Sequence, residues 1–181
     1  MSVLISRQGV PASPIGALAL RRRAERMLLA LALADAELSI VLCDDATIHG
    51  LNRAHRKHDK PTDVLAFALR EGKALKGAEG MLGDVVISLD TARRQAAQHD
   101  RALWDEVTML LAHGLLHLIG YDHRTDAEER RMNARADMLI AAASAGRPQA
   151  RASIVDKPAR AGDSRARRGA PKAPAKRIKR K

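Results

Sequence analysis

The chain has very few aromatic residues and only one cysteine. One Phe, one Tyr and one Trp make up 2% of its 181 residues, so a buried core must be built from Leu, Ile, Val, Ala and Met. The single thiol, Cys43, excludes an internal disulfide framework and fits a reducing compartment. No apolar run approaches the roughly 20 residues of a membrane span, and the first residues lack the layout of a signal peptide. We therefore expect a cytoplasmic protein without a membrane segment.

Basic charge is concentrated at one end of the chain. The net charge of +11 comes entirely from residues 147–181, which hold 13 Lys and Arg against two Asp. Residues 1–146 hold 19 basic and 19 acidic residues and have no net charge. The basic segment has little apolar surface to offset its ordering entropy. We expect one folded domain over 1–146 and a disordered basic tail over 147–181. Such a tail attracts a polyanion, RNA in particular; a solubilising extension without a specific role is the alternative.

The order of apolar patterns predicts an α+β fold. Alternating or β-branched runs predict about four strands, at 2–6, 37–45, 63–69 and 82–90. Amphipathic segments predict helices between and after them, at 13–35, 46–57, 91–100, 102–119 and 125–146. We expect a single domain with a mixed sheet of about four strands and several helices.

Local signals predict where several helices begin and end. Ser13 ahead of Pro14 suits the start of the first helix. Asp44 or Asp45 can cap the second helix. Gly120 can end the fourth helix in a left-handed turn, which other residues adopt only at a cost in free energy.

Three of the chain's seven histidines, His113, His117 and His123, lie within eleven residues. On a helix the first two differ by about 40° and about 6 Å of rise, so both imidazoles can bind one metal ion. A turn at Gly120 would then bring His123 back toward them. Three nitrogen ligands leave a fourth position for water, as in catalytic zinc sites. We predict one divalent metal ion, Zn²⁺ in the first instance; three unrelated histidines on a half-buried helix would explain the spacing less well.

The same histidine spacing occurs in zincin-type peptidases, where a Glu follows the first histidine and acts as general base. Here that position is Gly114, which cannot take a proton. The sequence thus predicts a zincin-like metal helix but argues against peptide hydrolysis by that route. A metal site of this kind can still assist other hydrolytic reactions.

Three segments together resemble one known family. The stretch "HGLLHLIGYDH" at 113–123 is similar to the signature of the YbeY-type endoribonucleases. The stretch "LNRAHRKHDKPTDVLAFAL" at 51–69 resembles that family's Leu-Asn-x-x-x-Arg and Lys-Pro-Thr-Asp-Val-Leu-Ser-Phe segment, and "LGDVVIS" at 82–88 resembles its Gly-Asp-Ile-x-Ile-Ser strand. The resemblance covers roughly residues 2–143, with the motifs in the family's order. It departs at Ala66 and Ala68, where the family usually has Ser and Pro.

The resemblance implies a metal-dependent endoribonuclease that cleaves single-stranded RNA. The implied roles are processing of ribosomal RNA, notably maturation of the small-subunit 3′ end, and ribosome quality control, with the ribosome or its small subunit as partner. It places the metal ligands on His113, His117 and His123, and a functionally important arginine on Arg56. The tail at 147–181 lies outside the family's core.

Arg56 suits the implied role on physical grounds. It is expected at the end of the helix 48–56, beside a polar loop. A guanidinium binds a phosphodiester through paired donors and stabilises charge that develops on it. We therefore predict Arg56 as a catalytic residue rather than an ordinary surface arginine.

Other polar residues near these motifs have less definite predictions. Asp122 either orients a histidine or caps the following helix, and the sequence does not decide between them. Asp63 and Asp84 are expected to be hydrogen-bonding residues of a loop or strand end rather than ligands. The same groove as Arg56 can be lined by Lys57, His58 and Lys60.

The favoured prediction is therefore a metal-dependent RNA hydrolase acting in ribosome biogenesis. The alternative is a non-catalytic rRNA-binding assembly factor whose metal only stabilises the fold. The sequence gives no indication of the oligomeric state.

Overall fold

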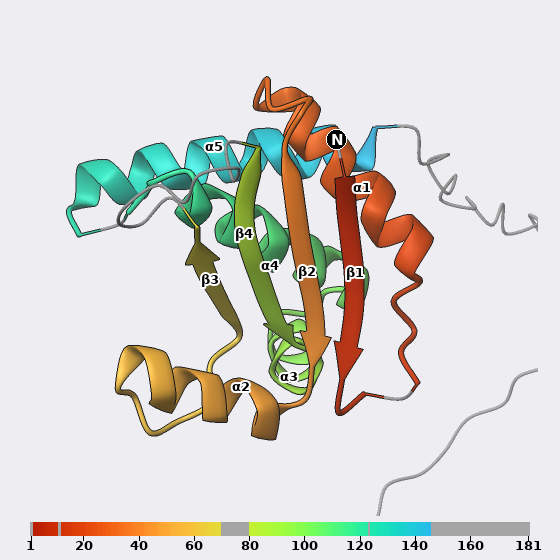
Figure 1. Cartoon of the computed structure of the whole chain (residues 1–181), viewed down its shortest axis with the longest axis vertical. Helices are drawn as coiled ribbons and strands as arrows, with labels where there is room; N and C mark the ends of the chain where they lie inside the picture. The colour runs from red at the N-terminus through yellow and green to blue at the C-terminus, as the bar shows by residue number, and fades with distance from the viewer. Residues whose placement is uncertain (1, 11, 70–79, 123, 146–181) are drawn as a thin grey trace, which may run out of the picture. The chain divides into compact units, whose positions relative to one another are not determined.

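The computed structural model describes residues 2–10, 12–69, 80–122 and 124–145 (Figure 1). The predicted tail at 147–181, most of the expected loop after Leu69 and the histidine at 123 lie outside the described residues. The elements of the described chain are β1 (Ser2–Gln8), α1 (Ala17–Ala30), β2 (Glu37–Cys43), α2 (Asp45–Leu51), the π-helical turn η1 (Asn52–Arg56), β3 (Val64–Ala68), β4 (Met81–Ser88), α3 (Leu89–Gln98), α4 (Leu103–Leu118) and α5 (Asp126–Ser144).

The four strands form one mixed sheet in the order β1-β2-β4-β3. β1, β2 and β4 run parallel, and β3 pairs antiparallel with β4, so that Ala66 lies opposite Val85. The predicted α+β domain with a mixed sheet of about four strands is confirmed. Among the described strands, β3 forms one edge of the sheet, and α4 packs against it as well as against β4.

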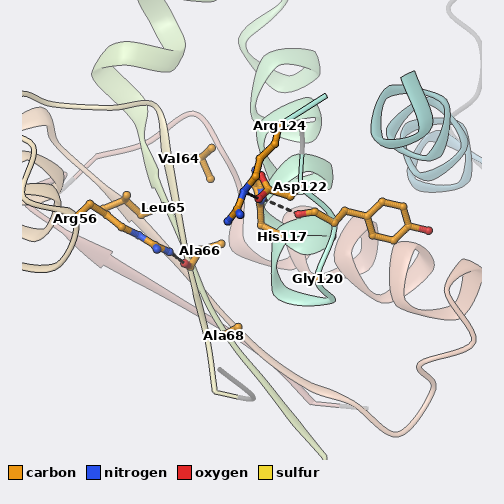
Figure 2. Close-up of a pocket in the computed structure, with 10 residues that line it drawn as sticks. Arg56, Val64, Leu65, Ala66, Ala68, His117, Gly120, Asp122 and Arg124 are labelled. Atoms are coloured by element: carbon orange, nitrogen blue, oxygen red, sulfur yellow. Dashed lines mark hydrogen bonds and ion pairs between the residues drawn. The ribbon is translucent and has the colours of Figure 1, made fainter. Parts of the chain in front are cut away.

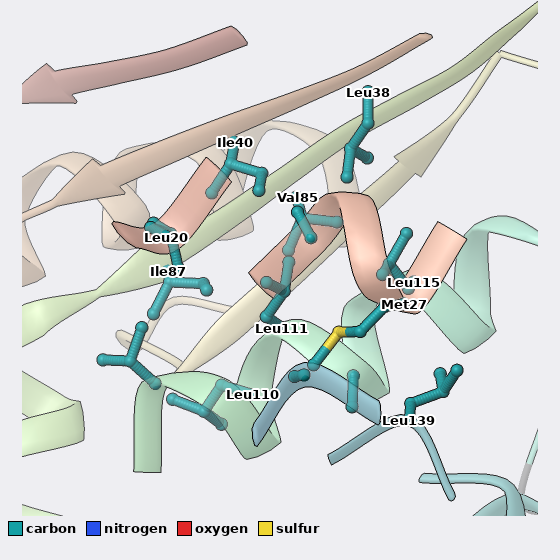
Figure 3. Close-up of a cluster of buried hydrophobic side chains, with 14 of the residues drawn as sticks. Leu20, Met27, Leu38, Ile40, Val85, Ile87, Leu110, Leu111, Leu115 and Leu139 are labelled. Carbon is teal, nitrogen blue, oxygen red and sulfur yellow. The ribbon is translucent and has the colours of Figure 1, made fainter. Parts of the chain in front are cut away.

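The two faces of the sheet pack against different helices. One face contributes Leu38, Ile40, Val85 and Ile87 to the main core, which they share with α1, α4 and α5 (Figure 3). The opposite face contributes a smaller cluster, in which Cys43, Leu65 and Val86 pack on Ile48 of α2. Most of this buried surface is aliphatic, as the scarcity of aromatic residues predicts.

The predicted cap of the second helix is confirmed, and α5 begins with a cap of its own. Asp44 caps α2, because its Oδ1 accepts a hydrogen bond of 2.8 Å from the Thr47 amide. The Thr47 hydrogen bonds hold the pKa of the Asp44 carboxyl below its usual value. At the other end of the chain, Thr125 caps α5 in a capping box with Glu128.

The predicted start of the first helix at Ser13 is wrong. α1 begins at Ala17, with Gly16 as its N-cap. The Ser13 hydroxyl instead accepts a hydrogen bond from the Ile15 amide, and the Ile15 carbonyl accepts one of 2.9 Å from Arg7. Ile15 is fully buried, so these residues are held in a bent, non-helical path by tertiary contacts that override the local signal.

Candidate active site

Two of the three predicted metal ligands lie one turn apart on α4. His113 and His117 are both half-buried on a helix whose other faces are almost entirely covered. The Nδ1 atom of His113 lies 3.1 Å from the Met109 carbonyl oxygen, and that of His117 lies 3.0 Å from the Tyr121 carbonyl oxygen. A carbonyl can only accept, so each Nδ1 carries the proton. In the neutral ring, Nε2 then holds the lone pair that a metal ion binds.

The two histidines line one hollow of about 380 Å³ between α4 and β3. Its other walls include Asp63, Val64 and Gly114. Gly114 lets the helix approach the sheet closely, since an added Cβ would lie 2.5 Å from Val85 Cγ1. A glutamate at position 114, the base of zincin-type peptidases, has no room in this packing.

Gly120 ends α4 as predicted. It has φ +89°, its amide bonds to the His117 carbonyl, and the Tyr121 amide bonds back to the Leu116 carbonyl. These two bonds form a Schellman motif. The turn also brings the Tyr121 carbonyl to His117, so the end of the helix fixes the orientation of that imidazole.

Arg56 lies at the end of η1, as the sequence predicted for the helix that contains it. Its guanidinium donates a hydrogen bond of 2.8 Å to the Ala66 carbonyl on the edge strand β3. It also lies 6.0 Å from the centre of the Phe67 ring. Lys57 follows with φ +62° and ends the turn, which directs the chain into the loop before β3.

Arg56 and His117 line the same cleft, which has a volume of about 380 Å³ (Figure 2). Arg56 comes from one side of the cleft with β3, and His117 comes from the other side with the turn at Gly120. Arg124 also lines the cleft and pairs with Asp122, Nε to Oδ2, at 2.6 Å. The cleft therefore joins guanidinium groups to an imidazole, which suits a phosphate group.

The remaining predicted residues have distinct positions. Asp63 is a hydrogen-bonding residue, as predicted: its carboxylate accepts from the Val64 amide and from the Gln95 side chain. Asp84 lies on β4, opposite Phe67. Asp122 does not cap α5, because Thr125 does, so that alternative is wrong. The side chains of Lys57, His58 and Lys60 are exposed beside η1.

The described residues contain part of a donor set that suits a metal ion. Within them, no three His, Cys, Asp or Glu side chains are grouped closely enough to hold one. The predicted third ligand, His123, is outside the described part of the chain. His113 and His117 fit a metal chemically, because backbone carbonyls orient both rings through Nδ1, an arrangement common among metal-binding histidines.

Two features of the cleft were not predicted from the sequence. Arg124 lines it although no motif marks that residue, and Ala68 lines it where the resemblance only indicated a departure from the family. The small side chains at Ala66 and Ala68 leave this side of β3 open to the cleft. Neither feature has a signal in the sequence alone, because both depend on how β3 meets the end of α4.

An α+β domain with a cleft lined by arginine and imidazole is suited to a ligand that carries phosphate, and comparison with known proteins identifies the family. The model of the family "Endoribonuclease YbeY" matches residues 17–144. The chain belongs to this family and is an endoribonuclease, an RNA-cleaving hydrolase. This result favours the catalytic prediction over the non-catalytic assembly factor.

Individual relatives agree with the family match. An Endoribonuclease YbeY from Geobacter metallireducens is 45% identical over 130 residues, which cover 71% of this chain and 87% of the relative. One from Anaeromyxobacter sp. is 52% identical over 130 residues, covering 68% and 66%. The solution structure of TM1509 from Thermotoga maritima has the same fold, with a TM-score of 0.54 at 23% identity over 78% of this chain and 89% of that one.

The helices of the described chain do not meet the requirements of a membrane span. Each one falls short in length or in apolar character, so none of those described can cross a bilayer.

Proposed function

We propose that this endoribonuclease cleaves single-stranded RNA in the cleft between β3 and the end of α4. The observation that carries the proposal is that Arg56 and His117, from distant parts of the sequence, line the same cleft. Its volume of about 380 Å³ lies in the range of small-ligand sites. A space of that size suits a short stretch of single strand, whose backbone and bases are accessible, better than a duplex.

Arg56 binds the phosphodiester that is cleaved. Its guanidinium already donates to the Ala66 carbonyl, which holds it at the rim of the cleft. The remaining N–H donors of the fork are suited to paired hydrogen bonds with two phosphate oxygens. Because charge builds up on those oxygens during cleavage, donors fixed in advance stabilise the transition state more than the ground state.

His113, His117 and His123 hold one divalent metal ion, with zinc as the first candidate. The carbonyl contacts at Nδ1 of the first two rings support this proposal, since they direct the lone pair to Nε2. When bound, the ion supplies positive charge that polarises a phosphoryl oxygen and acidifies water. The hollow lined by His113 and the cleft lined by Arg56 share His117, so the ion and the arginine would act on the same phosphate.

The cellular role proposed is maturation of ribosomal RNA in the cytoplasm, including the 3′ end of the small-subunit RNA, together with ribosome quality control. The family resemblance supports this role, and the ribosome or its small subunit is the expected partner. The basic segment 147–181, with 13 Lys and Arg, adds an electrostatic attraction to RNA.

The test compares wild type, two site variants and one control variant, prepared in parallel, on one single-stranded RNA and on its duplex. Wild type should cut only the single strand. Arg56→Ala should keep its fold and metal but lose about 10³-fold in rate, the scale for an arginine that stabilises phosphoryl-transfer charge. The double variant His113→Ala, His117→Ala should be inactive.

Arg53→Ala is the matched control, because Arg53 is an exposed arginine of the same helical turn that does not line the cleft. It should retain the wild-type rate. Equal RNA degradation by all variants would indicate contaminating nuclease and would refute the proposed site. For the cellular role, cells lacking the protein should accumulate small-subunit RNA with unprocessed 3′ ends, and normal ends would refute it.

A further inference from the structure

A second hollow of about 380 Å³ lies beside the cleft and has a different chemical character. Most of its walls are aliphatic: Leu31 and Leu33 follow α1, Leu82 is the second residue of β4, and Leu118 and Ile119 lie at the end of α4. Leu82 and Leu118 are nearly fully buried, while Leu31, Leu33 and Ile119 are half-buried. The hollow is thus an extension of the main core that opens at the surface, and we name it the apolar hollow.

The apolar hollow and the cleft share part of their walls. Ala68, His117 and Gly120 line both of them. A molecule held between Arg56 and His117 therefore lies against the mouth of the apolar hollow. Because Ala68 has a small side chain and Gly120 has none, little protein separates the cleft from the apolar hollow.

Two left-handed turns build the walls of the apolar hollow. Ala32 has φ +58°, and the Leu33 amide bonds back to the Leu28 carbonyl at 2.9 Å, which closes a Schellman motif after α1. The turn places Leu31 and Leu33 on either side of Ala32. The motif at Gly120 does the same for the end of α4. Both walls are therefore held by backbone hydrogen bonds and do not need a ligand to form.

A nucleotide has a matching pair of properties, a charged phosphate and a planar base with apolar faces. We propose that the apolar hollow binds one nucleobase of the RNA strand whose phosphate lies between Arg56 and His117. This inference rests on the proposed function, in which that cleft holds the scissile region of the RNA. The continuity of the two spaces favours a nucleobase over any separate apolar ligand, because one nucleotide fills both.

The proposal also explains a preference for single strands. A base enters the apolar hollow only if it leaves the stack of its neighbours, and in a duplex it must break its base pair as well. The described residues that line the hollow include no Phe, Tyr or Trp, and five of them are Leu or Ile, so the base is held mainly by enclosure among aliphatic side chains, with the His117 imidazole at the wall shared with the cleft. The hollow then discriminates between nucleobases mainly by their size.

The test uses short single-stranded RNAs that carry 2-aminopurine at one position at a time. The emission of this base analogue is quenched by stacking on its neighbours, and the described residues that line the apolar hollow include no Phe, Tyr or Trp ring on which it would stack again. Full-length, metal-loaded protein is mixed with each RNA at saturating concentration, and emission is read in the first milliseconds, before product forms. Emission should rise at one position of the RNA only.

Leu33→Phe narrows the hollow, and Leu29→Phe is the matched control, since Leu29 is a 56% exposed leucine at the end of α1 that does not line the hollow. The rise should persist in Leu29→Phe and disappear in Leu33→Phe. RNA that lacks the base at that position should bind wild type and Leu29→Phe about tenfold more weakly. Leu33→Phe should bind the RNA that lacks this base at least as tightly as it binds the intact RNA. Leu31→Phe provides a second narrowing variant if Leu33→Phe fails to fold.

A rise at no position, a similar rise at every position, or an equal rise in Leu33→Phe and Leu29→Phe would overturn the proposal. The test changes none of the proposed catalytic or metal-binding residues, so its outcome can be told apart from that of the cleavage assay. A position-specific rise in a protein that does not cleave RNA would support base binding in the apolar hollow and count against the proposed reaction. Cleavage without any such rise would support the proposed reaction and count against base binding in the hollow.

Discussion

Gly114 and Val85 approach so closely that a Cβ added to the glycine would lie 2.5 Å from Val85 Cγ1 and 3.1 Å from its Cγ2. This contact fixes the distance between α4 and the sheet at the level of the two histidines. It also explains in steric terms why the zincin-type base is missing, since the space for its side chain is occupied by the core. Stability and site geometry thus depend on the same glycine.

Gly114→Ala should destabilise the fold by about 1–3 kcal/mol, the usual cost of overpacking a core. Gly50→Ala is the matched control, because Gly50 lies in α2 with nothing within 4 Å of an added Cβ. There, alanine should stabilise by roughly 0.5–1 kcal/mol through its better helix propensity. Urea unfolding of both variants measures the difference, and equal effects of the same sign would contradict the close packing.

Purified protein should carry about one divalent ion per chain, as expected for a single three-histidine site. His117→Ala should lose it, because the ring that the Tyr121 carbonyl orients is removed. His99→Ala, an exposed histidine at the end of α3, should keep it. Elemental analysis measures the ion, and wild-type protein that is free of metal after careful preparation would refute the site.

Replacing all Lys and Arg of residues 147–181 by Gln should weaken RNA binding and flatten its dependence on salt. The segment holds 13 of these residues, and the salt slope grows with the number of phosphates neutralised. The substitution keeps the length of the segment, so a loss of affinity reports charge alone. Binding titrations between low and high salt give the slope, and an unchanged slope would show that the segment does not contact RNA.

The Cys43 thiol should be inert in the folded protein. Burial, together with the nearby charges of Asp44 and Asp45, raises its pKa to about 12. A thiol reagent at pH 8 should therefore react only after denaturant is added, because the thiolate is the nucleophile. Rapid labelling of the native protein would contradict this burial.

The same shift makes stability depend on alkaline pH. The unfolded thiol ionises near pH 8.5 while the folded thiol stays protonated, so the folded state binds the extra proton. Its contribution is complete below about pH 8.5 and is lost as the pH rises toward about 12. Cys43→Ala should show a shallower fall in the free energy of unfolding between pH 8 and pH 10 than wild type.

The features that the sequence predicted are those that short stretches of chain determine. Asp44 caps α2 through Thr47, three residues away, and Gly120 ends α4 through bonds within the preceding turn. Such signals need no knowledge of the rest of the molecule. The family resemblance located Arg56 and the histidines in the same way, by motifs of contiguous residues.

Features that depend on distant parts of the chain were missed or mispredicted. The first helix does not start at Ser13 as predicted, because the Ile15 carbonyl accepts a hydrogen bond from Arg7. The cleft itself requires β3 to lie antiparallel at the sheet edge, and the direction and neighbours of a strand do not follow from its own residues. The apolar hollow draws on four separate segments, the residues after α1, β3, the start of β4 and the end of α4, so no local pattern indicates it.

The hydrogen bond from Arg56 to the Ala66 carbonyl has a consequence for the solubility of the molecule. Within the described sheet, β3 is the last strand, and the outer rim of such a strand is a template onto which another chain can add. A guanidinium that occupies a carbonyl of this rim, and that brings positive charge to it, opposes pairing with a second copy. The arginine proposed to bind RNA therefore also occupies part of the strand edge at which a second copy could pair.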